Sequence, residues 1–339
     1  MAELYGQRIQ TTVQQKYLPY VVDTILNSNV LFQRVVRASK KWSGRTMRIP
    51  IKTSKNTTGT SFRGFDTFSV AATDNRQFME YTPSFYQITC ALPGDELSVA
   101  DTEDKILDLM KLTIQSDTED MADDLGTIFY ADGTGNGSKD PLGLAALVDD
   151  GTSVATIGGL NRNTYTTLQG TVTASGGTLT LAKIDTLWNN VTSGAQKPSA
   201  FYTTEAVFSF YGQLLRPQER INKEASLMKG LQAGTGFTAL SYMGKPVLMD
   251  EKCTSGVLFA LREEDLEWYA LPYKFGQPVA YKSQVEGNDY SAPIGLGFSW
   301  SDWIVPANAG GVVGHVYFGG QFLTRNPKRQ GKLTGITSI

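Results

Sequence analysis

The side chains that most often carry chemistry in proteins are scarce in this sequence. His315 is the one histidine among 339 residues, and no acid follows Asp302 that could join it as a metal ligand. No nucleophile elbow is present, and His315 lies in an alternating stretch typical of a strand, so we interpret it as a structural residue. Cys90 and Cys253 stand far apart, which suits a reducing compartment and supports no particular disulfide.

A glycine-rich run at 133–139 has the residue types of a phosphate or calcium loop. Its Gly-Ser-Lys order differs from the Gly-Lys-Ser/Thr of a P-loop, and the run follows a helical pattern instead of a strand. Asp132, Thr134 and Asn136 stand at offsets like those of an EF-hand, but Gly143 occupies the place of the required glutamate. We interpret the run as a helix stop followed by a turn, and we predict no cofactor and no metal site.

Carboxylates are the remaining candidates for chemistry. Residues 95–132 hold twelve acids against Lys105 and Lys111. Neighbouring acids such as Asp123 and Asp124 could do acid–base work or hold a metal ion. They fall on one helix face with no histidine or cysteine near them in sequence, so we predict a solvated or partner-facing surface and no enzyme activity.

Charge is distributed unevenly, although the net charge is only -2. Residues 1–65 carry eleven bases against two acids, opposite in sign to the acidic segment 95–132. Such blocks are either solvated faces that happen to cluster or complementary surfaces within one subunit or between neighbours. The basic segment lacks aromatics at base-stacking density, so any contact with nucleic acid would go to phosphates without sequence preference.

The elements that would position these charges begin with a long β-hairpin over residues 46–92. Residues 46–51 alternate at period two, and Pro50 indicates an edge strand. A polar, glycine-punctuated stretch at 55–66 predicts a loop tip, and aromatic and β-branched residues at 78–90 predict the return strand. Because an isolated two-stranded ribbon is marginal in water, this hairpin needs a partner surface.

The clearest helix is predicted over residues 101–131. Apolar residues follow helical spacing along it, and acids fill the opposite face. Before the hairpin, residues 1–45 are polar and basic with few apolar anchors, which indicates an extended arm with a short helix lying on something else.

The rest of the chain mixes helices and strands, which predicts an α+β protein. Helices are expected at 181–191 and 204–215, and strands at 199–203 and 241–250. Residues 218–237 are expected to form a loop, and 257–339 to be mainly β. No apolar run is long enough to span a membrane, and residues 1–5 do not start a secretory signal.

The order of these elements resembles the major capsid proteins of tailed bacteriophages, which have the HK97-like fold. Local echoes support the likeness over nearly the whole chain. They are the helix exit Ala131-Asp132-Gly133-Thr134-Gly135, the following Asp140-Pro141-Leu142-Gly143-Leu144, the segment Tyr242-Met243-Gly244-Lys245-Pro246-Val247, and the late Gly319-Gly320-Gln321-Phe322-Leu323.

The resemblance implies a division of the chain into capsid domains. Residues 1–45 would be the N-terminal arm, and 46–94 the extended β-hairpin loop lying across a neighbouring subunit. Residues 95–139 and 301–339 would form the peripheral domain with its long spine helix. Residues 140–300 would form the axial domain, with the loop 218–237 meeting its copies at five-fold and six-fold axes.

The implied function is self-assembly into an icosahedral shell around double-stranded DNA, in a virion assembled in a host bacterial cytoplasm. The implied partners are copies of the chain in hexamers and pentamers, a portal protein, a separate scaffolding protein, an optional decoration protein and packaged DNA, with no membrane. Some family members join subunits through Lys–Asn bonds, for which Lys55 and Asn326 are the nearest candidates, but we do not expect this chemistry here. The candidate contact residues between subunits are Arg34, Arg37, Lys40, Lys41, Lys55, Arg63, Phe65, Asp117, Asp120, Asp123 and Asp124.

Two other functions stay open from the sequence. An encapsulin-like nanocompartment would share the fold and enclose an enzyme instead of DNA. A two-domain, metal-dependent enzyme would use the acidic helix as its ligand source. Shell contents distinguish the first, and bound metal together with monomeric behaviour distinguishes the second.

Overall fold

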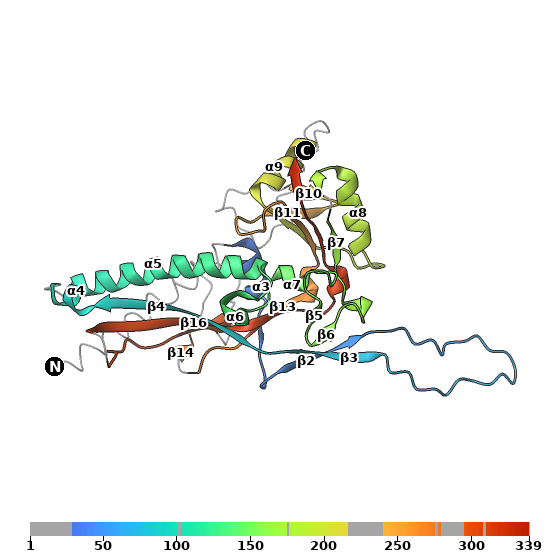
Figure 1. Ribbon diagram of the computed structural model, residues 1–339, viewed down its shortest axis with the longest axis horizontal. Coiled ribbons are helices and arrows are strands. Elements are labelled where there is room, and N and C mark those ends of the chain that lie inside the picture. Colours follow the sequence, from blue (N-terminus) through green and yellow to red (C-terminus); the bar gives the residue numbers. More distant parts are fainter. Residues whose placement is uncertain are drawn as a thin grey trace.

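The computed structural model describes residues 29–99, 103–174, 176–215, 240–274, 277–278, 295–307 and 310–338. An elongated lobe, a second lobe standing beside it and a long projecting hairpin make up the molecule (Figure 1). Among the described residues, no helix combines the length and apolar character that crossing a membrane would require. The predicted α+β class is confirmed.

The elongated lobe, here called the spine lobe, is built on one mixed sheet and one long helix. Its strands run in the order β1-β13-β16-β15-β14, and β4 also pairs with β16. Helix α5 runs along β4 and β16 (Figure 1). The elements of this lobe are α3 (Val30–Arg37), β1 (Lys40–Lys41), β4 (Ser84–Pro93), α4 (Gly94–Val99), α5 (Glu103–Tyr130), β13 (Leu266–Ala270), β14 (Gln277–Pro278), β15 (Phe298–Trp300) and β16 (Gly311–Thr324).

The second lobe is a six-stranded sheet in the order β10-β11-β9-β12-β17-β7. Helices α8 and α9 cover one face of it, and Leu187, Trp188, Val207 and Tyr211 are buried there. Its elements are β7 (Thr171–Thr173), β8 (Gly177–Thr178), α8 (Leu181–Val191), β9 (Ala200–Thr203), α9 (Glu205–Leu215), β10 (Leu240–Tyr242), β11 (Lys245–Met249), β12 (Leu258–Leu261), β17 (Gly331–Leu333) and β18 (Ile336–Ser338).

One apolar core joins the two lobes. Tyr202 and Phe259 of the second sheet belong to the same buried cluster as Phe129 and Trp268 of the spine lobe. Within this cluster the ring of Trp268 stacks on Phe318, with 4.8 Å between centroids. Burial of several aromatic side chains in a single cluster favours cooperative folding of the two lobes.

Most predicted helices and strands match the described ones, but the predicted return strand 78–90 is divided. Strand β3 (Arg76–Tyr81) pairs with β2 (Met47–Lys52) in the hairpin, whereas β4 pairs with β16 in the spine lobe, so the hairpin ends at Tyr81 and not at residue 92. The long helix runs from Glu103 to Tyr130, and Met110, Ile114, Met121 and Leu125 are buried as its spacing indicated. The helix at 181–191 begins after Thr180, whose side chain accepts a hydrogen bond from the Lys183 amide. The predicted loop at 218–237 lies outside the described residues.

The short helix expected within residues 1–45 is α3, and the surface on which it lies is the core of its own chain. Leu31, Phe32 and Val36 are at most 1% exposed, and the Phe32 and Phe129 rings meet at 4.8 Å. Helix α3 comes close to α5 because residue 126 is glycine. A Cβ there would lie 2.4 Å from the side-chain amide nitrogen of Asn29, which donates a hydrogen bond to the Ala122 carbonyl.

Strand pairing also divides the chain differently from the predicted boundary at residue 300. Strands β13 and β15, inside the range predicted as axial, pair with β16 in the spine lobe. Strand β17, inside the range predicted as peripheral, pairs with β12 and β7 in the second lobe. The chain crosses between the lobes after residue 261 and again after 324, so a single boundary at 300 cuts both sheets.

Candidate assembly surfaces

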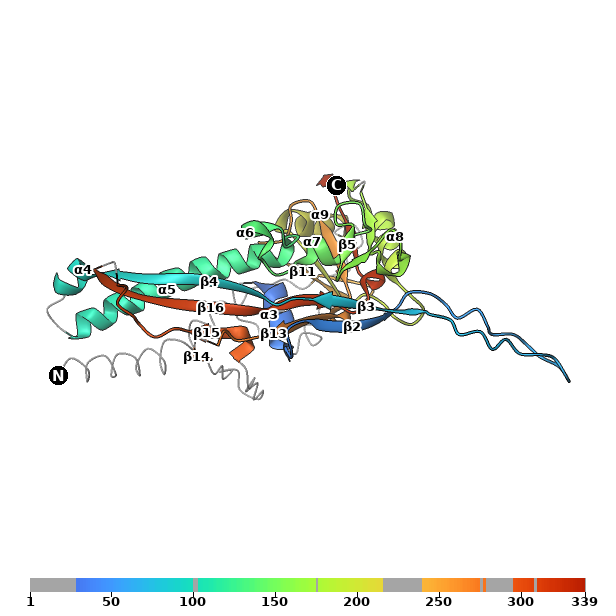
Figure 2. The ribbon, with the colours of Figure 1, turned by 60° about the horizontal axis from the view of Figure 1, so that its bottom comes forward.

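The hairpin leaves the body of the molecule and ends in a loop of exposed apolar side chains. Strands β2 (Met47–Lys52) and β3 (Arg76–Tyr81) form its two-stranded base. Residues 53–75 connect them and extend well beyond every other described element (Figures 1 and 2). The exposed apolar residues of the loop are Phe62, Phe65, Phe68 and Val70, with Phe65 fully exposed.

The loop tip has local order of its own. The Phe62 and Phe68 rings meet edge to face with centroids 5.0 Å apart. Between them the Asp66 carboxylate accepts a hydrogen bond from the Arg63 amide at 2.8 Å, which closes a turn. The tip therefore presents a small aromatic cluster to its surroundings. Of these side chains only Phe65 was predicted from the sequence as a contact residue. The signal available for Phe62 and Phe68 was the presence of aromatic residues in and just after a polar, glycine-punctuated stretch.

The base of the hairpin is clamped by the segment from β5 (Thr156–Ile157) to β6 (Leu160–Asn161). The Glu80 amide donates to the Gly158 carbonyl at 2.9 Å, and Met79 is fully buried beneath it. Gly158 has φ +53, and a Cβ there would come within 2.6 Å of Met79. Only glycine combines this backbone conformation with such close approach.

A buried ion pair, Arg162 with Asp149, lies next to the β5–β6 segment that contacts the hairpin. Arg162 is 0% exposed, lies 3.6 Å from the Asp149 carboxylate and donates to the Ala146 and Val154 carbonyls. Lys332 of β17 approaches the same carboxylate at 3.5 Å, and burial lowers the pKa of both bases, with Asp149 opposing that shift. This network could not be predicted from the sequence, because its members are separated along the chain and meet only through tertiary packing.

The acidic face of α5 is partly used inside the subunit. Asp123 pairs with Lys252, and Asp124 accepts a hydrogen bond from the Tyr86 hydroxyl. Asp120 is exposed on the outer face. Asp117 is partly exposed, and its carboxyl lies beside the buried Cys90 of β4. Burial raises the pKa of the Asp117 carboxyl, and the neighbouring Asp120 adds to that rise.

The basic segment is also engaged within its own chain, on acids outside the spine helix. Arg34 makes two hydrogen bonds to Glu263, at 2.6 and 2.8 Å, and Lys40 lies 2.5 Å from Glu267. Lys41, Lys55 and Arg63 are exposed, whereas the side chain of Arg37 lies outside the described part of the chain. The described ion pairs of the basic segment therefore do not join it to the acidic helix of its own subunit.

The comparisons with known proteins bear on this arrangement. The chain aligns with a chain of the cyanophage A-1(L) capsid asymmetric unit over 91% of its own length and 93% of the other's, with 13% identity and a TM-score of 0.64. The chain has the HK97-like capsid fold.

Two further solved structures share this fold. The holo-SrpI encapsulin complex from Synechococcus elongatus matches with a TM-score of 0.54 and 12% identity, covering 90% of this chain and 86% of that one. The capsid of an empty GTA particle matches with a TM-score of 0.52 and 10% identity, covering 92% and 90%. No family model and no curated protein matches the sequence.

In terms of the HK97-like fold, α5 is the spine helix and residues 53–75 are the tip of the extended loop. The remaining chemical candidates take structural positions. His315 Nδ1 lies 3.0 Å from the Thr89 hydroxyl across the β4–β16 pair. Asp132 accepts hydrogen bonds from Thr134 at the spine-helix exit, as expected for a helix stop and turn. Among the described residues, no three histidine, cysteine, aspartate or glutamate side chains gather in a way that could hold a metal ion.

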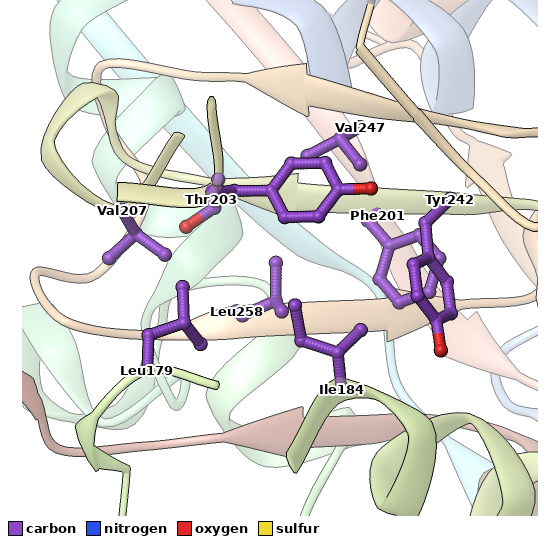
Figure 3. A pocket seen from close by; sticks show the side chains of 9 residues that line it. Leu179, Ile184, Phe201, Thr203, Val207, Tyr242, Val247 and Leu258 are labelled. Atoms are coloured by element: carbon purple, nitrogen blue, oxygen red, sulfur yellow. The ribbon is translucent and has the colours of Figure 1, made fainter. Parts of the chain in front are cut away.

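A small apolar pocket lies between α8, α9 and the second sheet (Figure 3). Its polar atoms are the hydroxyls of Thr203, Tyr211 and Tyr242. Thr203 donates to the Val257 carbonyl and Tyr211 to the Ser241 carbonyl, each at 2.9 Å, and Tyr242 donates to Asp185. Each hydroxyl is thus satisfied within the chain, and the pocket resembles a packing space of the core more than a ligand site.

Proposed function

We propose that this protein is the major capsid protein of a tailed bacteriophage, which self-assembles into a closed icosahedral shell around double-stranded DNA. The observation that carries the proposal is the extended loop. Residues 53–75 project beyond the rest of the subunit and expose an aromatic cluster that no described residue of the same chain covers. Such a loop is stable only against a partner surface.

The proposed mechanism is the sum of many small interfaces. Burial of one phenylalanine side chain contributes roughly 1.5–3 kcal/mol, so the cluster of Phe62, Phe65 and Phe68 is a strong anchor on a neighbour. The clamp at Gly158 would fix the direction in which the loop leaves its subunit. Exposed charges, including Asp120 on the spine helix and Lys55 on the loop, would steer association and make its rate depend on salt.

The proposal also assigns partners and a location. The subunits would form hexamers and pentamers of a virion shell, assembled in the host bacterial cytoplasm. A portal protein, a separate scaffolding protein and an optional decoration protein would complete the shell, and DNA would contact it without sequence preference. The spine lobe would take the peripheral position, and the second lobe the axial one. The proposal assigns no catalytic step and no cofactor to the chain.

An encapsulin-like shell is the second candidate, because an encapsulin complex shares the fold over 90% of this chain. Contents distinguish the two. Particles captured with an antibody against this chain, from cells that make it, should contain nuclease-resistant DNA and one minority protein at portal stoichiometry. An enclosed cargo enzyme without DNA would contradict the phage assignment and favour the encapsulin.

A further inference from the structure

The two strands at the base of the extended loop have different free edges. Thr53 donates to the Asn75 carbonyl at 2.9 Å, which fixes the alternation of the β2–β3 ladder. With this register the backbone groups of Arg48, Pro50 and Lys52 face away from β3, and those of Arg76, Phe78 and Glu80 face away from β2. The outward bond from the Glu80 amide to Gly158 agrees with this assignment.

The free edge of β2 is protected against pairing. Pro50 stands at its centre, opposite Phe78, and has no amide hydrogen to donate. Arg48 and Lys52 flank it with exposed charged side chains. Proline residues and charged side chains are two of the features by which proteins prevent a strand edge from pairing.

The free edge of β3 carries charged side chains at Arg76 and Glu80 but has no proline, so each outward-facing residue keeps a backbone amide that can donate. Among the described residues no strand pairs with it, and Glu80 is the one outward-facing position whose amide is already bonded. The Phe78 side chain is 59% exposed on this edge. An unpaired edge with an exposed aromatic residue is a template for an added strand.

We propose that the β3 edge from Arg76 to Phe78 pairs with an extended segment of a second copy of this chain, and that Pro50 restricts this pairing to one side of the hairpin. This inference rests on the proposed shell function. A second copy is the occupant because the hairpin projects away from the rest of the described chain, beyond the reach of the described strands (Figures 1 and 2). The edge continues toward the exposed cluster of Phe62, Phe65 and Phe68, which such a neighbour would also cover.

One-sided pairing gives the interface a polarity. A neighbour that can bind only along β3 always approaches from the same side, so each loop engages one neighbour and the chain of contacts can close. If both edges were open, strands could add on both sides and give open ribbons or aggregates.

A matched pair of proline variants tests the inference. Arg76 and Lys52 are partners across the ladder, both are exposed, and both have outward-facing amides. Arg76→Pro removes a donor from the open edge, whereas Lys52→Pro removes one from the edge already closed. We expect Arg76→Pro to raise the critical concentration for assembly at least about tenfold, a loss of about 1.4 kcal/mol per contact, and Lys52→Pro to assemble like the wild type.

Hydrogen exchange on the full-length protein gives an independent readout. Assembly should slow exchange of the Arg76 and Phe78 amides in the 76–81 peptide and leave the 47–52 peptide unchanged. Equal assembly of the two proline variants, or equal protection of the two peptides, overturns the inference even if shells form. A wild-type chain that never self-associates overturns the inference and the shell function together.

A converse test restores the missing backbone donor on the free edge of β2. Pro50→Thr supplies the missing amide in a residue that favours strands. We expect sedimentation to show irregular, oversized assemblies at the expense of uniform particles, with the folded subunit unchanged by circular dichroism. Uniform particles in normal yield would show that Pro50 does not restrict the pairing.

Discussion

At the scale of single residues, a few buried polar groups hold the parts of the subunit together. Asp250 is 3% exposed and accepts hydrogen bonds from the Leu31 amide and the Tyr130 hydroxyl, at 3.1 and 3.0 Å. It thereby joins the start of α3, the end of the spine helix and the turn after β11. Leu31 lies in the first turn of α3, where the amides lack partners within the helix and an anionic acceptor is favourable.

Removal of this acceptor should destabilise the subunit. Asp250→Ala leaves both donors buried and unpaired, which we expect to lower the free energy of unfolding by about 2–4 kcal/mol. Asp250→Asn keeps one oxygen acceptor and should lose roughly half as much. Urea unfolding of the unassembled subunit measures both. Equal losses in the two variants, or none in the alanine variant, would contradict this role.

The Asp117 carboxyl lies where partial burial disfavours its ionised form. Asp117 stands three residues after Ile114 and four before Met121, next to the buried stripe of the spine helix, and its Oδ2 atom is buried beside Cys90. Its spacing from Ile114 and Met121 can be read from the sequence, but the many acids around it concealed that its carboxyl lies beside the buried stripe. Because the pKa of this carboxyl is raised, its ionisation opposes folding at neutral pH.

Asp117→Asn should therefore stabilise the subunit at pH 7, by about 1 kcal/mol. The penalty in the wild type begins as pH rises above the unfolded pKa, about 3.9, and is complete above the raised folded value. The difference between the two proteins should thus shrink toward zero as pH falls below about 4. Thermal unfolding across this range checks the sign; a variant less stable at pH 7 and unchanged by pH would refute it.

At the scale of elements, helices and strands with a regular apolar spacing and clear end signals could be predicted from the sequence. Contacts that fix one element on another across long sequence separations could not. The spine helix and the hairpin followed from their apolar spacing and from Pro50. The burial of α3 did not follow, since it depends on Gly126 and Asp250, which are distant in sequence and have no local signature. The clamp of Gly158 on Met79 was missed for the same reason, as was the crossing of residues 266–270 into the spine lobe.

The loop should be dispensable for folding and required for assembly. Thr53 and Asn75 face each other at the end of the ladder, so an Asn-Gly turn can replace residues 54–74. We expect the unfolding free energy of the subunit to change by no more than about 0.5 kcal/mol, because the loop contributes nothing to the core. Light scattering should show no particle formation. Shells of normal size from this variant would show that the loop is not an assembly element.

Substitution of two acids on the spine helix should separate the effect of charge on assembly from its effect on subunit stability. Asp123→Lys places a second lysine beside Lys252 and should lower subunit stability by up to about 1 kcal/mol. Asp120→Lys changes an exposed side chain, so stability should stay within about 0.5 kcal/mol while assembly slows, most clearly at low salt. Calorimetry of the subunit and time-resolved scattering measure the two effects. Wild-type assembly rates for Asp120→Lys would remove the acidic face from the interface.

At the scale of the whole molecule, the subunit consists of two lobes with a common core and one projecting hairpin. The two lobes share one apolar core, so they should unfold together, while the hairpin projects beyond them and carries exposed aromatic side chains. A monomer with this shape leaves its loop unburied. A shell built from copies of the chain covers the loop of every subunit, which is why we place the function in assembly.

Electron microscopy of the purified full-length chain, expressed alone and concentrated, tests this account most directly. We predict closed, uniform particles with five-fold vertices, in which each extended loop lies over an adjacent subunit. A population of monomers or small soluble oligomers, stable at every protein and salt concentration tried, would contradict it.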